Sequence, residues 1–153
     1  MSPTTLTLTR RMAAIPRALT QIRIWKRDGK LDLLMGQLCH QGGFVPSIRD
    51  PQGNWRAPAA AKALSELGGK EFPVLKKHYE SLLARATATP DDAEIAARMW
   101  TVYAIGLSRS PEAREFLEQL VETAERPDGF KLAGVSADDA RFALSLSQQK
   151  DKP

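Results

Sequence analysis

Residues 89–125 read TPDDAEIAARMWTVYAIGLSRSPEAREFLEQLVETAE, and this stretch decides the fold class. Thr89, Pro90 and the two aspartates after them are a helix start signal, because a side-chain oxygen can accept from the first turn and acidic groups face the positive end of the helix dipole. The helix that follows is apolar almost all round, which predicts that it is sandwiched between neighbours at the centre of the fold. Its side chains expected to be most buried are Met99, Trp100, Val102 and Tyr103.

Further helical segments lie on both sides of this central helix. A second start signal at residues 110–112 opens a segment with an apolar stripe on one face and glutamates on the other. A third start signal, at residues 136–139, opens a short last helix. The remaining helices, predicted from apolar residues at helical spacing, cover residues 16–27, 31–38, 58–67 and 72–86. No convincing set of strands occurs. The two segments before residue 40 are the least clear of these seven, so the sequence predicts an all-α fold of five to six helices.

The chain of 153 residues is long enough for one domain with a sizeable core. We expect a single helical domain over residues 1–150, with a long irregular loop at 41–58 and a frayed tail at 148–153. The loop carries three glycines and three prolines, and a loop of this length is often functional. No apolar run approaches 18 residues, which excludes a transmembrane helix. The single cysteine, Cys39, cannot form an internal disulfide, and a cytoplasmic location is expected.

Three short segments share a pattern of alanine, an apolar residue and a small residue. They are Ala63-Leu64-Ser65, Ala104-Ile105-Gly106 and Ala143-Leu144-Ser145, spaced by 41 and 39 residues. A period near 40 with two helices per unit resembles HEAT-type repeats. The resemblance implies a short α-solenoid that acts as a scaffold for protein or nucleic acid. The alternative is an irregular helical bundle.

The net charge of +4 is unevenly distributed along the chain. Residues 1–49 carry +6, residues 50–89 carry +2 and residues 90–153 carry −4. If these segments also separate in space, the basic end is suited to an anionic partner. The alternative is an ordinary solvated surface of a basic protein.

Basic residues near the N-terminus make the candidate binding site. Arg23, Lys26 and Arg27, together with Lys30, fall at i, i+3, i+4 and i+7 and share one face if the helix continues through residues 28–29. Such a stripe can follow phosphates, and a tryptophan among cations can stack on an exposed base. The candidate nucleic-acid-binding residues are Arg10, Arg11, Arg17, Arg23, Lys26, Arg27, Lys30, Arg49, Trp55 and Arg56.

No residue set in the sequence argues for catalysis, and an enzyme with its site in a cleft stays open as a third hypothesis. One cysteine and two histidines cannot make a four-ligand structural zinc site, and no metal or cofactor is expected. The carboxylate pairs at 91–92 and 138–139 stand where helix starts favour acidic groups. The sequence therefore predicts a non-enzymatic module, or a small subunit of a larger complex, that contacts the backbone of RNA or DNA. The alternative is a HEAT-like protein–protein adaptor; neither a membrane nor a small-molecule substrate is expected as partner.

Overall fold

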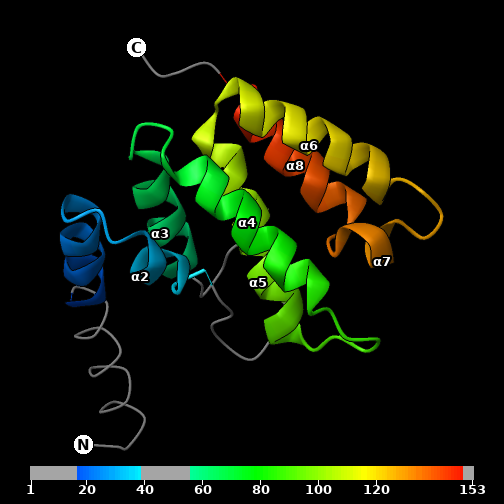
Figure 1. Cartoon of the computed structure of the whole chain (residues 1–153), viewed down its shortest axis with the longest axis horizontal. Helices are drawn as coiled ribbons and strands as arrows, with labels where there is room; N and C mark the ends of the chain where they lie inside the picture. Colours follow the sequence, from blue (N-terminus) through cyan, green and yellow to red (C-terminus); the bar gives the residue numbers. More distant parts are fainter. Residues whose placement is uncertain (1–16, 39–55, 150–153) are drawn as a thin grey trace, which may run out of the picture.

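The computed structural model describes residues 17–38 and 56–149 (Figure 1). All regular structure in these two ranges is helical, which confirms the all-α class. The helices are an N-terminal helix over 17–27, α2 (Leu31–Met35), α3 (Arg56–Ser65), α4 (Glu71–Ala84), α5 (Asp92–Ser108), α6 (Pro111–Ala124), α7 (Gly129–Ala133) and α8 (Ala137–Ser147). The described residues thus hold eight helices, more than the five or six expected: both N-terminal segments are helical, and α7 is a five-residue helix that was not predicted.

The start signals act as local caps. The Asp91 carboxylate accepts from the Glu94 backbone N–H at 2.9 Å, and the Ser110 and Ser136 hydroxyls make equivalent bonds of 3.1 Å at the starts of α6 and α8. The cap of α5 is therefore Asp91 and not Thr89, because the helix begins two residues after Pro90. Pro111 occupies the first position of α6, as expected from its missing N–H.

Helix α5 is the centre of the fold, as its apolar surface predicts. It packs against α3, α4, α6 and α8. Met99, Trp100 and Val102 are at most 2% exposed. Tyr103 differs from the prediction, because it is half-buried and faces a hollow between α3 and α5.

The alanine–apolar–small pattern marks a close helix crossing. Gly106 of α5 lies directly against Ala143 of α8, so that a Cβ at position 106 would be 2.6 Å from the Ala143 carbonyl oxygen. Only glycine allows the two backbones to approach this closely. Two of the three patterned segments therefore contact each other.

Several element boundaries differ from those expected. Helix α3 begins at Arg56, so the last three residues of the expected loop 41–58 are helical. The helix expected to reach residue 38 ends at Met35. Residues 1–16, 39–55 and 150–153, with most of the expected loop and tail, lie outside the described residues.

The helices of the two ends of the chain lie on opposite sides of the molecule, and α8 packs against both α5 and α6. The N-terminal helix, α2 and α3 lie on the left in Figure 1, α4 and α5 in the middle, and α6, α7 and α8 on the right. Within residues 17–38 and 56–149, no helix has both the length and the apolar character needed to cross a membrane.

Candidate nucleic-acid interface

The described part of the chain holds six of the ten candidate residues. Arg10, Arg11, Arg49 and Trp55 lie outside it. Arg17, Arg23, Lys26 and Arg27 are on the N-terminal helix, Lys30 follows that helix, and Arg56 is the first residue of α3. The structure therefore brings four of the six onto one element.

The predicted stripe does not extend to Lys30, which corrects the sequence prediction. The N-terminal helix ends at Arg27, and Gly29 takes a left-handed conformation with φ of +66°. That conformation favours glycine and turns the chain into α2, for which Lys30 is the N-terminal flanking residue. The stripe on the helix therefore consists of Arg23, Lys26 and Arg27.

Two hollows flank the exposed side of α3, and we call them the α3 hollows. The first, of about 340 Å³, lies between the N-terminal helix and α3. The second, of about 660 Å³, lies between α3 and the C-terminal part of α5. The two share Ala59, Lys62 and Glu66, so α3 forms the ridge between them.

Basic side chains outnumber acidic ones on the walls of the α3 hollows. Arg23 and Lys26 come from the N-terminal helix, Lys62 from α3 and Arg109 from the residue after α5. Glu66 is the one acidic side chain among the described lining residues. This arrangement leaves an excess of three positive charges for an anionic ligand.

An ion pair crosses the first hollow. The Lys26 ammonium binds the Glu66 carboxylate, and the two side chains are 37% and 41% exposed. Exposed pairs of this kind contribute about 0–1 kcal/mol, so a phosphate can replace the carboxylate at little cost. The pair also joins the N-terminal helix to the end of α3.

Arg27 is less available than the sequence suggested. Its Nε donates to the Asp28 carboxylate at 3.1 Å. This hydrogen bond raises the pKa of Arg27 and lowers the pKa of Asp28, both of which are exposed. A phosphate near Arg27 therefore meets a neighbouring negative charge.

Tyr103 supplies an aromatic wall to the second hollow. Its ring packs edge to face against Trp100, with centroids 5.3 Å apart and an interplanar angle of 85°. Burial raises the pKa of Tyr103, so the hydroxyl keeps its proton at neutral pH and can donate a hydrogen bond. A ring held in this way can also stack against a base that enters the hollow.

Arg109 has a strained backbone at the edge of the same hollow. Its φ is +54°, and it is the one non-glycine residue with a positive φ among the described residues. A side chain in the left-handed region costs roughly 1–2 kcal/mol, and such strain clusters at functional sites. The Arg109 side chain lies on the wall that Lys62 and Tyr103 also line, and its Nη2 donates to the Gln149 side-chain oxygen at 3.5 Å.

The opposite end of the molecule carries the acidic charge. Helix α6 has an exposed face of glutamates, and it lies far from the N-terminal helix in Figure 1. These glutamates are Glu112, Glu115, Glu118, Glu122 and Glu125. The charge asymmetry along the sequence is therefore also a separation in space.

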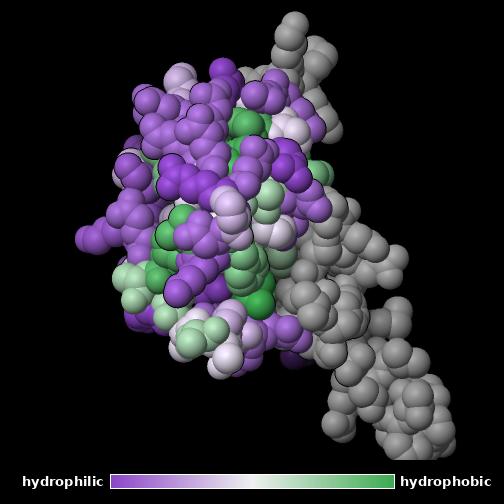
Figure 2. All heavy atoms as spheres, turned by 90° about the vertical axis from the view of Figure 1, so that its right-hand side faces the viewer, coloured by the Kyte–Doolittle hydropathy of each residue, from purple (hydrophilic) through white to green (hydrophobic). Residues whose placement is uncertain are grey.

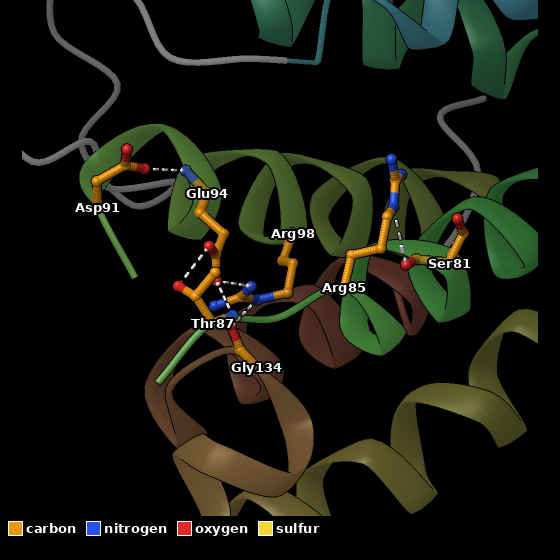
Figure 3. Close-up of polar contacts among 7 residues, drawn as sticks. All are labelled: Ser81, Arg85, Thr87, Asp91, Glu94, Arg98 and Gly134. Atoms are coloured by element: carbon orange, nitrogen blue, oxygen red, sulfur yellow. Dashed lines mark hydrogen bonds and ion pairs between the residues drawn. The ribbon is translucent and has the colours of Figure 1, made fainter. Parts of the chain in front are cut away.

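A buried arginine forms a second polar cluster, next to α7 (Figure 3). Arg98 donates through Nε to the Gly134 carbonyl at 2.8 Å and through Nη1 to the Glu94 carboxylate at 2.9 Å. Glu94 also accepts from the Thr87 backbone N–H at 3.0 Å and from the Thr87 hydroxyl at 2.8 Å. The backbone bond from Thr87, followed by the bond from Arg98, lowers the pKa of Glu94.

Sequence reasoning missed Lys62, Tyr103 and Arg109. They come from two helices that are far from the N-terminal stripe in sequence, and no local pattern connects them to it. Arg56 was expected to contribute, but it is half-buried at the start of α3 and lines neither hollow. Arg17 is exposed on the N-terminal helix, outside the walls of both hollows.

In the described part of the chain, His, Cys, Asp and Glu side chains nowhere gather in threes that could hold a metal ion. Comparison of the chain with family models, curated proteins and solved structures gave no match.

Proposed function

We propose that this protein is a non-enzymatic helical binding module that contacts the backbone of a nucleic acid through the α3 hollows. The observation that carries the proposal is the convergence of Arg23, Lys26, Lys62 and Arg109, from three parts of the chain, on two adjoining hollows. Phosphate recognition needs correctly spaced cations and no sequence-specific contact. Tyr103 adds a surface on which a base of a single strand can stack.

The acidic face of α6 favours binding of a nucleic acid at the opposite, basic end of the protein. A polyanion is attracted to the basic end and repelled by the glutamates at the other end, so the dipole of the protein steers it toward the α3 hollows. The same arrangement suits a small subunit whose acidic end contacts another protein of a complex.

Titration with a fluorescent single strand and a matched duplex, each at two salt concentrations, tests this function. We expect binding that weakens steeply as salt rises, and tighter binding of the single strand because only its bases can reach Tyr103. Lys62→Glu should weaken binding more than Lys76→Glu, a matched reversal on the exposed face of α4. Absence of binding at low salt would contradict the proposal.

A HEAT-like adaptor is the second candidate. Helices α3, α5 and α8 carry the three patterned segments, and α5 packs between the other two. This order is the one expected of the first helices of successive repeats in a short solenoid. If the chain binds neither the single strand nor the duplex at low salt, the acidic face of α6 becomes the surface to test against basic protein partners.

A further inference from the structure

A separate cavity of about 600 Å³ lies near α7, at the end of the molecule away from the N-terminal helix. Its apolar walls come from the end of α4, from the segment that leads into α5 and from α7, and they include Leu83, Pro90 and Phe130. Figure 2 shows this end of the molecule, where apolar side chains gather among polar ones in the lower half of the view. The volume is in the range of pockets that hold small ligands.

Arg98 forms the polar wall of this cavity. Its side chain is 2% exposed, and its hydrogen bonds to the described residues use Nε and Nη1. None of these bonds uses Nη2. Figure 3 shows the guanidinium held between Glu94 and Gly134, whereas Arg85 is bonded to Ser81 on α4 and takes no part in the cluster. Arg98 is thus a buried cation, fixed in place, with one nitrogen left for a ligand.

The charges at the cavity select the kind of anion. Glu94 already balances Arg98, and Lys131 on the cavity wall adds one further positive charge. One net positive charge matches a monoanion better than a dianion. Thr87 is engaged with Glu94, so the ligand would be held by the two cations.

The rim of the cavity favours an apolar body on the ligand. Phe130 of α7 is 44% exposed, one of the few large hydrophobic side chains that are exposed among the described residues. Phe130 also lines the cavity. Covering such side chains removes apolar surface from water, which stabilises a complex.

We infer that this cavity binds a small carboxylate with an apolar body, its carboxylate between Arg98 and Lys131 and its apolar part along Phe130. The inference is independent of the nucleic-acid function, because the cavity shares no residue with the α3 hollows.

Calorimetric titration with octanoate tests the inference, with octan-1-ol, acetate and inorganic phosphate as comparison ligands. We expect octanoate to bind and the three others to bind at least about tenfold more weakly, because each lacks the carboxylate, the apolar body or the single charge. Lys131→Gln should lower the affinity for octanoate about fivefold. Lys77→Gln, on the exposed face of α4, should leave that affinity unchanged. Phe130→Ser should also weaken it, without affecting the hydrogen bonds of Arg98.

Both substituted side chains at the cavity are exposed, so the variants are expected to fold as the parent does. Octanol binding as tightly as octanoate, phosphate binding more tightly, or no octanoate binding at all would overturn the inference. Equal affinity of the Lys131 and Lys77 variants would overturn it as well. Shifts of the Thr87 and Gly134 amide resonances on adding octanoate would place the ligand in this cavity, and shifts confined to the α3 hollows would contradict it.

Discussion

The two halves of the chain differ in how their helices begin. In the C-terminal half, α5, α6 and α8 each start with a side chain that accepts from the first turn, and the five-residue α7 has no such cap. In the N-terminal half, α2 and α4 start after Lys30 and Lys70, and neither has a side-chain cap. Lysine has no acceptor to offer the free N–H groups, and its charge opposes the positive end of the helix dipole.

The halves also differ in how their helices are held together. Helices α5 and α8 cross backbone to backbone at Gly106 and Ala143. The N-terminal helix contacts α3 across a hollow, with the exposed Lys26–Glu66 pair joining them. From this difference we expect substitutions in the C-terminal half to cost more stability, whereas the N-terminal half presents exposed cations.

Trp100→Ala should have the largest effect on stability. The side chain is fully buried at the centre of the fold, and truncation of a buried tryptophan costs about 3–5 kcal/mol. Trp25→Ala, on the partly buried face of the N-terminal helix, is the matched control and should cost less. Chemical denaturation measures both, and equal losses would remove the distinction between the halves.

Gly106→Ala should destabilise the protein by about 1–3 kcal/mol, because the new methyl group meets the backbone of α8 and not a flexible side chain. Gly36→Ala, just after α2, is the control, since a Cβ there would find its nearest atom at 3.5 Å. The free energy of unfolding should change little in that variant. A neutral Gly106→Ala would mean that the two helices can separate at no cost.

Ser136→Ala should cost about 1 kcal/mol, because the Asp139 backbone N–H loses its acceptor at the start of α8. Ser81→Ala, at an exposed position of α4, is the control for the loss of a hydroxyl. The melting temperature of the Ser136→Ala variant should be a few degrees lower than that of the Ser81→Ala variant. A melting temperature that is the same in both would show that the caps do not distinguish the halves.

Arg109→Gly should have the smallest effect and the opposite sign. Relief of the left-handed strain exceeds the entropy that glycine adds to the unfolded chain, and the net gain is about 0.5–1 kcal/mol. Affinity for a single strand should fall at the same time, because the cation is lost from its hollow. Arg109→Ala separates the two effects, since it loses the cation and keeps the strain; a gain in stability there would contradict the explanation.

The helix starts could be predicted from the sequence because capping residues and apolar stripes are local patterns. Ser110 and Ser136 each precede an apolar stripe at helical spacing, and this local pattern predicted the helix starts. In the structure both serines are N-caps. Asp91 lies two residues after the predicted cap Thr89. The prediction placed Pro90 at the first helical position, whereas α5 begins at Asp92. The short helix α7 was not predicted, because its five residues are too few to show a helical period.

The site was harder to predict than the fold. Arg23, Lys26 and Arg27 form a stripe that the helical period identifies, and the structure has them on one helix. Lys62 and Arg109 join Arg23 and Lys26 only through the packing of α3 between the N-terminal helix and α5, which no local pattern encodes. Gly29 separated Lys30 from the stripe, and its left-handed conformation depends on the turn that it makes into α2.

The most direct test of the central claim is the salt dependence of single-strand affinity in a variant with Arg23, Lys26 and Arg27 all changed to glutamate. Each cation that contacts a phosphate contributes about 0.7 units to the salt slope of a single strand. Arg23 and Lys26 line the first hollow, whereas Arg27 is bonded to Asp28, so the slope should fall by about 1.4 units while the circular-dichroism spectrum is unchanged. The reversal of Lys76 and Lys77 on α4 is the control and should leave the slope near that of the parent. Equal losses in both variants, or no loss in either, would contradict a binding site at the N-terminal end.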